Sequence, residues 1–253
     1  ERLLLLPRYD HGRICNFKNI LISAAEKKIM REQKTYGRRR GRRLRPSQME
    51  RLQTLLPQLS LTIHEGKIQG LSPLTNPYKG YFLEIGFGAG EHLILQAEKN
   101  PDILMIGCEP FINGVAHILK AVEEKSLTNL RLYPGNALDL LPFLPENSAE
   151  KIFLLFPDPW PKASHHKRRF VQTENLLLLS KVLKKEGLLL MATDHLAYLE
   201  WMIEKTSTHP FLRWENPSSE TWHIPPPLWI PTRFQQKAEK AGRTSHFLWF
   251  RKV

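Results

Sequence analysis

Cysteine is nearly absent from this chain, which has only two among 253 residues. Cys15 and Cys108 lie far apart, without the close cysteine or histidine partners that zinc and redox motifs require. Long apolar runs are missing too. None approaches the roughly 20 residues that cross a bilayer, and residues 3–6 are too few for the core of a signal peptide. These absences predict a cytoplasmic protein with neither a bound metal nor a membrane span.

One stretch near the N-terminus has almost no acidic residues. Between Lys27 and Arg45 there are ten lysines or arginines and a single acid, Glu32, so the remaining chain holds only +3 of the net charge of +12. This basic arm, predicted over residues 1–45, favours a polyanionic partner because each neutralised phosphate releases counterions. Arginines interleaved with glycine and tyrosine favour a nucleic acid. A solubilising tail and a tether to an acidic membrane are the alternatives.

From residue 78 onward, apolar runs of strand length alternate with amphipathic runs of helix length. We predict strands at 81–85, 103–108, 130–133, 151–156 and 188–193, and helices at 91–99, 111–124, 137–141, 173–184 and 196–206. This alternation indicates a parallel sheet covered by helices on both faces. Two further strands, at 211–214 and 246–251, are expected to close one edge in the antiparallel sense. Residues 46–77 are predicted to form a short helix, capped by Ser47 and ended by Pro57, and a linker to the 78–253 domain.

A glycine-rich turn follows the first predicted strand. Gly86, Gly88 and Gly90 permit a tight turn and close approach of the backbone to a ligand. Glu109 ends the second strand, where a carboxylate can accept both hydroxyls of a ribose. A nicotinamide dinucleotide and S-adenosylmethionine both fit these features. Two details favour S-adenosylmethionine: the third glycine comes one residue earlier than in the dinucleotide pattern, and Glu84 would repel a pyrophosphate but attract the ammonium of methionine.

The most unusual stretch follows the fourth predicted strand, where three prolines surround one acid in Pro157-Asp158-Pro159-Trp160-Pro161. The prolines end the strand and stiffen the loop. A carboxylate held rigidly there, beside an indole and ahead of the cations Lys167-Arg168-Arg169, suits the binding of a nucleobase for chemistry. A proline-rich turn with solvated charges is the alternative. The adjacent His165 and His166 have no third ligand at zinc-like spacing, so we expect no metal.

Together these motifs resemble the bacterial tRNA (guanine-N7-)-methyltransferases, over a region from about residue 35 to the C-terminus. The matching segments are Glu84-Ile85-Gly86-Phe87-Gly88, Asp158-Pro159-Trp160-Pro161-Lys162, His165-His166-Lys167-Arg168-Arg169, Thr193-Asp194-His195, Pro231-Thr232-Arg233-Phe234 and Thr35-Tyr36-Gly37-Arg38-Arg39-Arg40-Gly41. The resemblance implies an α/β class I S-adenosylmethionine-dependent methyltransferase fold, Rossmann-like and mostly parallel. It also implies S-adenosylmethionine as cofactor and N7 of a guanine in the tRNA variable loop as target.

The resemblance further implies roles for individual residues. The expected cofactor contacts are Glu84, Gly86, Gly88, Gly90, Glu109, Asn136 and Asp158, of which Asp158 is also the expected catalytic residue. The expected substrate contacts are Lys162, Asp194, Thr232, Arg233, Phe234 and Gln235. The expected RNA contacts are Ser164, His165, His166, Lys167, Arg168, Arg169, Arg38, Arg39 and Arg40. Three positions depart from the family pattern: Ser164 replaces an arginine, Gln235 a glutamate and Ala238 a glycine.

The chemistry of guanine N7 gives these residues specific tasks. N7 carries an in-plane lone pair and no proton, so its methylation needs alignment and exclusion of water but no general base. An ionised Asp158 can accept from N1–H and the exocyclic amine, which selects guanine over adenine and stabilises the positive charge of the product. Trp160 either stacks on the base or packs in the core. A cation beside N7 would oppose the reaction, so Lys162 is assigned to a phosphate or to ordering the loop.

Two polar residues carry two interpretations each. Asn136 can offer an amide to the adenine edge, or cap the next helix. Asp194 can act on the base from another side, or cap the helix that follows it.

Three other functions remain alternatives. An amino-methyltransferase would place two prolines before its aromatic residue, whereas Trp160 directly follows Pro159 here. An RNA-binding protein without catalysis could have the same fold, and a nicotinamide enzyme is opposed by Glu84. The sequence leaves open whether the protein is a monomer or a homodimer.

Overall fold

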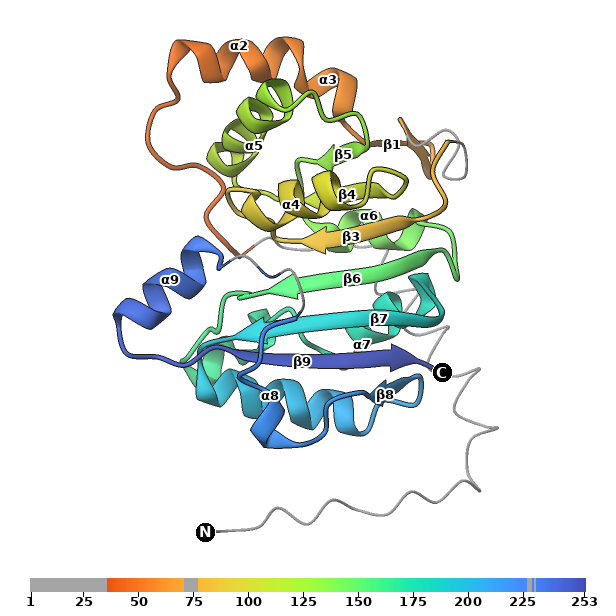
Figure 1. The fold of residues 1–253 in the computed structure, drawn as a ribbon, viewed down its shortest axis with the longest axis vertical. Coiled ribbons are helices and arrows are strands. Elements are labelled where there is room, and N and C mark those ends of the chain that lie inside the picture. Colours follow the sequence, from red (N-terminus) through yellow and green to blue (C-terminus); the bar gives the residue numbers. More distant parts are fainter. Residues whose placement is uncertain (1–35, 71–76, 227–228, 230) are drawn as a thin grey trace. The chain divides into compact units, whose positions relative to one another are not determined.

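The computed structural model describes residues 36–70, 77–226, 229 and 231–253 (Figure 1). The first 35 residues of the predicted arm lie outside this part of the chain, as do residues 71–76 of the predicted linker.

Seven strands of the described chain form one sheet, in the order β5-β4-β3-β6-β7-β9-β8. Their bounds are Tyr81–Ile85 for β3, Leu104–Cys108 for β4, Leu130–Tyr133 for β5, Ala149–Leu155 for β6, Leu183–Thr193 for β7, Leu212–Trp214 for β8 and His246–Lys252 for β9. The strands from β5 to β7 pair in parallel, and β9 pairs antiparallel with both β7 and β8. The predicted parallel sheet with antiparallel closing strands is therefore confirmed.

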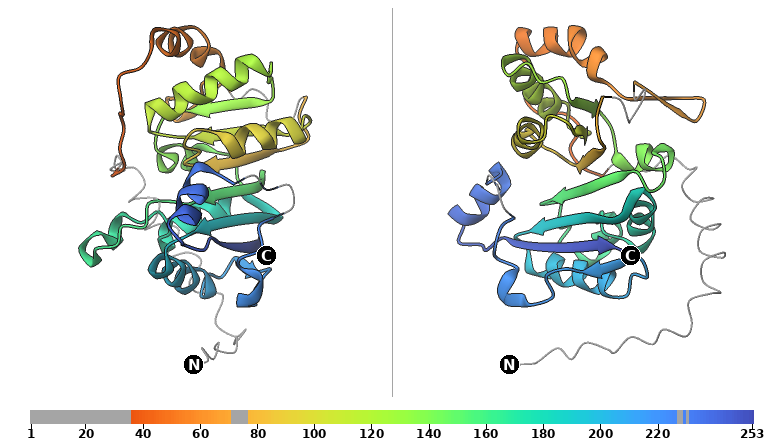
Figure 2. Two further views of the ribbon diagram at one scale, coloured as in Figure 1. Left: turned by 60° about the vertical axis from the view of Figure 1, so that its left-hand side comes forward. Right: turned by 45° about the vertical axis from the view of Figure 1, so that its right-hand side comes forward.

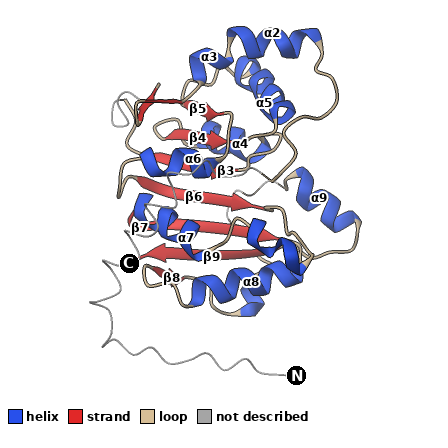
Figure 3. Cartoon of the chain, turned by 180° about the vertical axis from the view of Figure 1, so that it is seen from behind, coloured by secondary structure: helices blue, strands red, loops and turns tan. Residues whose placement is uncertain are grey.

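Helices cover both faces of this sheet. In Figure 1, α4 (Glu91–Lys99) and α5 (Ile112–Glu124) lie in front of the strands, and Figure 3 shows α6 (Ala137–Leu140), α7 (Thr173–Val182) and α8 (Leu196–Ser207) on the opposite face. Every residue of β3 and β4 is buried, as expected for parallel strands with helices on both sides.

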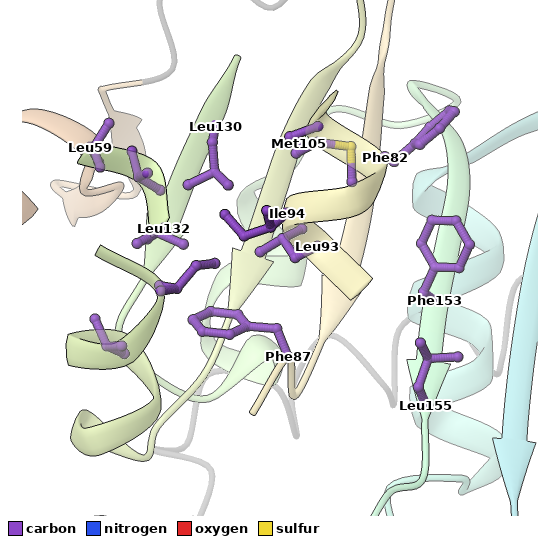
Figure 4. Close-up of a cluster of buried hydrophobic side chains, with 14 of the residues drawn as sticks. Leu59, Phe82, Phe87, Leu93, Ile94, Met105, Leu130, Leu132, Phe153 and Leu155 are labelled. Carbon is purple, nitrogen blue, oxygen red and sulfur yellow. The ribbon is translucent and has the colours of Figure 1, made fainter. Parts of the chain in front are cut away.

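A hydrophobic core between α4, α5 and the sheet fixes the base of the site. Figure 4 shows Leu93 and Ile94 of α4 among side chains from β3, β4 and β5, with Phe87 beside them. Phe87 is 5% exposed, although it belongs to the glycine-rich turn. Burial of this ring stabilises the turn by roughly 2 kcal/mol and holds it at the end of β3.

The segment before the main domain differs from the prediction. Helix α2 (Pro46–Thr54) begins after Arg45, whose backbone N–H donates to the side chain of Gln48. Pro46 suits the first turn because its missing N–H has no helical partner there, so Ser47 is not the cap. Pro57 likewise sits in the first turn of α3 (Leu56–Leu59) instead of ending the helical region.

A hairpin and a helix were not predicted. Strands β1 (Thr62–His64) and β2 (Lys67–Gln69) form a hairpin whose turn residues Glu65 and Gly66 both have positive φ. Helix α9 (Arg233–Lys240) is strongly amphipathic but buries only Gln235 and Ala238. Both elements are short and mostly polar, so hydrophobic periodicity hides them. Figures 1 and 2 show α9 beside the edge toward which the parallel strands point.

Strand β7 begins five residues earlier than expected. Residues Leu183 to Gly187 continue the strand before the predicted start, and the pairing of β6 with β7 shifts register between Ala149 and Lys151. The polar cluster Lys184-Lys185-Glu186 led to the prediction that a helix ends here. In the structure these residues lie on a solvent-facing extension of β7.

One buried histidine makes the fold sensitive to acid. His209 lies between α8 and β8 and is 2% exposed. Its Nδ1 accepts the N–H of Phe211 at 3.3 Å, whereas Nε2 has no hydrogen-bond partner among the described residues. Burial lowers the pKa of His209 to about 4. The imidazole is therefore neutral in the folded protein at pH values where the unfolded chain already binds a proton.

We predict that the free energy of unfolding falls by up to about 3 kcal/mol as the pH drops from about 6.5 to about 4 because of this residue. His209→Asn keeps an acceptor for Phe211 but cannot be protonated, so its unfolding free energy should decline less over the same pH range. Urea unfolding at several pH values measures the difference. His64→Asn, at an exposed position on β1, is the control and should follow the wild type; equal slopes for His209→Asn and the wild type would contradict the prediction.

Candidate active site

Three acidic residues predicted for the site follow or end three neighbouring strands. Glu84 lies near the end of β3, Glu109 follows β4 and Asp158 follows β6, and β3 pairs with both other strands. Burial is the main reason why the pKa of Glu109 is raised, and the charges of Asp158 and Glu84 raise it further. The structure therefore brings the three predicted carboxylates close enough to act on one another.

The glycine-rich turn has the conformation that the sequence predicts. Gly86, Gly88 and Gly90 have φ values of 74°, 58° and 87°, all in the left-handed region that favours glycine. The turn is also tightly packed, since a Cβ on Gly114 of α5 would lie 2.1 Å from the carbonyl oxygen of Gly88. A pocket of about 290 Å³ lies over this turn, between the first turns of α4 and α5 and the helix α9.

Glu84 forms the inner wall of this pocket together with a histidine that the sequence reasoning missed. Its Oε2 lies 2.7 Å from Nδ1 of His92, and both side chains are buried. The imidazole is held in place by the rings of Phe153 and Trp229, at centroid distances of 4.7 and 5.2 Å. His92 comes two residues after Gly90, on the buried face of α4, and this position was the available sequence signal.

Glu109 stabilises the glycine-rich turn through hydrogen bonds to the backbone. Its Oε2 accepts the N–H of Gly88 at 2.7 Å, and its Oε1 accepts the N–H of Phe111 at 2.8 Å. These two hydrogen bonds lower the pKa of Glu109 and partly offset the effect of its burial. Each oxygen keeps a lone pair for a further donor.

Asn136 caps α6, which is one of the two interpretations that the sequence allows. Its Oδ1 accepts the N–H of Leu138 at 3.1 Å. Its amide nitrogen has no hydrogen-bond partner in the described part of the chain, so the cap and the predicted amide donor are compatible.

Asp158 lies on a strained loop. Phe156 and Trp160, on either side of the Pro-Asp-Pro sequence, have φ values of 50° and 43°, which are unusual for aromatic residues. The Asp158 side chain is exposed and makes no hydrogen bond or ion pair with any described residue. The surrounding residues nevertheless remove enough water from the carboxylate to raise the pKa of Asp158 above the usual range. An unpaired acid on a rigid loop is available to bind a donor from outside the protein.

The residues after this loop form a short 3-10 helix over Ala163–Arg168. Lys162, Ser164 and Lys167 are exposed. His165 and His166 turn toward different partners, the rings of Trp160 and Trp201. In the described residues, no group of three or more His, Cys, Asp or Glu side chains is arranged to hold a metal ion.

The end of the predicted arm packs against this site. The ring of Tyr36 lies 6.4 Å from that of Trp160, and the Arg168 guanidinium lies over both rings, at 5.2 and 5.1 Å. A Cβ on Gly37 would lie 3.6 Å from Oδ2 of Asp158. The segment from Tyr36 therefore borders the acid, and Arg38, Arg39 and Arg40 follow it with exposed side chains.

Asn113 attaches the next residues to the start of α5. Its Oδ1 accepts the N–H of Gly41, and its Nδ2 donates to the carbonyl oxygen of Arg42, both at 2.7 Å. The carbonyl of Arg39 also accepts the N–H of Ile112 at 3.1 Å. These hydrogen bonds between the arm and the start of α5 were not predicted from the sequence, because only the fold brings Asn113 close to the arm.

The C-terminal substrate residues predicted by resemblance have different surroundings. Thr232 caps α9 by accepting the N–H of Gln235. Arg233 pairs with Glu91 at 2.6 Å and lies 3.0 Å from Nε2 of His117. Phe234 is 54% exposed, yet its ring faces Gly88. Three of these residues, Thr232, Arg233 and Phe234, line the pocket.

Gln235 and Asp194 have protein partners. Gln235 is buried, where it accepts the indole N–H of Trp229 and donates to Glu239 at 2.9 Å. Asp194 pairs with Arg243 at 2.8 Å. The capping position of α8 belongs to His195, so the alternative interpretation of Asp194 as a helix cap is not observed.

Arg169 lies inside the protein, in contrast to the other basic residues of its motif. It is 2% exposed, and its Nε donates to the carbonyl oxygen of Pro159 at 2.8 Å.

None of the helices in the described residues is long and apolar enough to cross a membrane.

Comparison with known proteins identifies the family of this chain. Residues 79–248 match the model of a family described as putative methyltransferase. The chain is 42% identical to the tRNA (guanine-N(7)-)-methyltransferase of Ruegeria sp., over 86% of this chain and 87% of that protein. It is 41% identical to the enzyme of the same name from Agrobacterium fabrum, over 85% of this chain and 93% of that protein.

Among solved structures, the 16S rRNA methyltransferase KamB superposes with a TM-score of 0.51 at 15% identity, over 76% of this chain and 99% of that chain. This similarity confirms the predicted class I methyltransferase fold. Identity of about 40% over most of the chain goes further than the fold, and the protein belongs to the tRNA (guanine-N(7)-)-methyltransferase family.

Proposed function

We propose that this protein transfers the methyl group of S-adenosylmethionine to N7 of a guanine in the variable loop of tRNA. The observation that carries the proposal is the position of Asp158, which has no protein partner, stands on a strained loop and follows the pocket residue Leu155 by three positions. Family membership supports the same reaction.

The acidic floor of the pocket suits S-adenosylmethionine, whose sulfonium and ammonium groups are both cationic. We assign the ammonium to Glu84, which faces the pocket from the end of β3. The ribose hydroxyls belong near Glu109, where each oxygen keeps a free lone pair beside its backbone hydrogen bond. The amide nitrogen of Asn136 is assigned to the adenine edge. Gly86 and Gly88 line the pocket and leave room for the methionine moiety, whereas Gly90 packs against Ile118 and shapes the turn.

The chemical step uses the lone pair of N7 as nucleophile, and sulfur leaves with the electron pair of its bond to the methyl carbon. Asp158 accepts hydrogen bonds from N1–H and the exocyclic amine, which orients the base. Its negative charge also stabilises the positive charge that methylation places on guanine. The raised pKa of Asp158 predicts that this support is lost on acidification at a higher pH than for an ordinary aspartate.

The exposed cations around this loop are the proposed binding surface for tRNA. Lys162 and Lys167 flank the acid on one side, and Arg38, Arg39 and Arg40 leave the other side next to Gly37. None of these five side chains pairs with a carboxylate among the described residues. Ser164, His165, His166 and Arg168 complete the surface. Phosphate contacts of this kind position the RNA without reading its sequence.

The roles proposed for residues 232–235 depend on whether each side chain faces the pocket or bonds within the protein. Arg233 and Phe234 point into the pocket from α9 and are proposed to contact the substrate. Thr232 and Gln235 are assigned to holding α9, because their polar atoms bond within the protein. Asp194 pairs with Arg243 through Oδ2, which leaves Oδ1 as the oxygen proposed to contact the base. A cytoplasmic location and a monomeric or homodimeric state stay predictions.

Labelled S-adenosylmethionine and tRNA lacking 7-methylguanosine test the proposal directly. After incubation, borohydride and aniline cleave RNA at 7-methylguanosine. Label incorporation together with one cleavage site in the variable loop is the expected result. Incorporation without cleavage would move the methyl group to another atom and overturn the N7 assignment, and absence of label would favour an RNA-binding protein without catalysis.

Asp158→Asn should reduce single-turnover methyl transfer at saturating tRNA by about 100-fold or more, because a neutral amide neither accepts from both donors nor stabilises the charge. Binding of S-adenosylmethionine, measured by calorimetry, should stay within about twofold of the wild type. Asp102→Asn is the control, since Asp102 pairs with Lys79 on the surface and lies at the other ends of the strands. Undiminished turnover in Asp158→Asn would remove this residue from the mechanism.

Replacing Arg38, Arg39 and Arg40 together by alanine should weaken tRNA binding and flatten its salt dependence. If each contacts a phosphate, the slope of log K against log salt should fall by about two to three. Filter binding over a range of salt concentrations measures this slope. The charge-matched control replaces Lys79, Lys125 and Lys181, which pair with acids on the surface. If both triple variants lower the slope equally, the effect is one of net charge and the arginines make no specific contact.

A further inference from the structure

Arg169 is a buried cation without an acidic partner. It is among the largest fully buried side chains, although Lys167, two residues earlier, is exposed. No carboxylate of the described residues forms an ion pair with it. Burial lowers the pKa of Arg169, because the protein interior solvates a charge less well than water does. Burying a charge without a counter-ion is costly, so the contacts that Arg169 makes must repay that cost.

These contacts involve carbonyl groups and aromatic rings. Nε donates to the carbonyl oxygen of Pro159 at 2.8 Å, and Nη1 donates to that of Ala197 at 3.4 Å. The guanidinium carbon lies 5.1 Å from the ring centre of Tyr198 and 5.0 Å from that of Trp201. The guanidinium therefore connects the Asp158 loop to the first turns of α8.

The loop has ring contacts at Trp160 but few hydrogen bonds. Residues 157, 159 and 161 are prolines and have no N–H to donate. Within the described chain, the bond from Arg169 is the one hydrogen bond that residues 157–161 make. Left-handed conformations at Phe156 and Trp160 persist only where the surroundings enforce them. The buried guanidinium supplies that restraint one residue after Asp158.

We infer that Arg169 is a positioning residue for Asp158, acting through the carbonyl of Pro159, and that it does not contact RNA phosphates. The neighbouring Arg168 acts on the other side of the loop, over the rings of Trp160 and Tyr36. Two adjacent arginines of one basic motif thus have separate tasks. This inference rests on the proposed function of Asp158.

The two readings of Arg169 predict different kinetics. As a positioning residue, Arg169→Gln should lower kcat by about 10- to 100-fold, because misplacement of a catalytic group by about 1 Å has an effect of this size. The Michaelis constant for tRNA, the Kd for S-adenosylmethionine and the salt slope of tRNA binding should stay within about twofold of the wild type. A phosphate contact would instead raise the Michaelis constant, reduce the salt slope by about one and leave kcat intact.

Two further variants sharpen the test. Arg169→Lys keeps the charge but loses the planar set of donors, so positioning predicts a low kcat, whereas a phosphate contact predicts nearly normal binding and turnover. Arg169→Ala leaves a cavity of the right shape, and added guanidinium should restore part of its kcat. Guanidinium should not restore Asp158→Asn. The matched control is Arg131→Gln. Arg131 lies on β5 and, among the described residues, also donates only to backbone carbonyls, so its loss should leave turnover unchanged.

Hydrogen exchange provides a readout that does not depend on activity. The amides of Phe156 and His165, which are hydrogen-bonded on either side of the loop, should exchange faster in Arg169→Gln than in the wild type or in Arg131→Gln. If Arg169→Gln does not fold, Trp201→Leu removes one of the two rings and should give a smaller fall in kcat with the same faster exchange. Unchanged exchange with intact kcat would overturn the inference alone. A wild type that never methylates N7 would overturn the proposed function and, with it, the catalytic role of Asp158 that Arg169 is inferred to support.

Discussion

The parallel pairing of β3 with β4 and β6 is the constraint on which the site depends. Ile85 lies opposite both Cys108 and Leu154, so the three strands end at nearly the same level. An acid at or just after each of these ends is therefore placed beside the other two without any direct bond between them. The glycine-rich turn begins at the same edge, and Phe87 fixes that turn in the core. A shift of one residue in either pairing would separate the acids and turn their side chains to the opposite face.

The charges of this region are divided between the floor of the site and its rim. Glu84 and Glu109, which we call the floor, are buried beside the glycine-rich turn, and the exposed cations of the arm and of the loop after Asp158 form the rim. An RNA phosphate is attracted to the rim and repelled by the floor, whereas a sulfonium is attracted to the floor. The same division suits a methylated guanine, which is cationic and which the proposed reaction places beside Asp158. Attraction between this cationic product and the Asp158 carboxylate also opposes product release.

Sequence reasoning predicted the parts of the fold that depend on apolar burial. The bounds of β3, α4 and β5 agree with the prediction, because each carries a buried run with polar or glycine residues at its ends. The hairpin, α9 and the start of β7 were missed, since their residues are mostly polar and tertiary contacts decide their structure. In the site, Asn136 caps α6, which was one of the two roles predicted for it. His92 and Asn113 were not predicted, because their hydrogen-bond partners come from other elements of the fold.

Arg169 illustrates why a motif alone cannot assign such residues. In the sequence it is the last of three consecutive cations, and the first two lie on or near the surface. A short helical turn rotates each side chain by more than 100° relative to the previous one, so a run of three cations cannot face the RNA together. One of the three side chains must therefore face the protein interior. A buried arginine is tolerated there only where neighbouring carbonyl groups need its N–H donors. The proline-rich loop creates that need, because it exposes carbonyl groups while lacking the N–H groups that would tie it to the sheet. The prolines that present Asp158 and the buried arginine behind it therefore form one device, and neither is expected to work without the other.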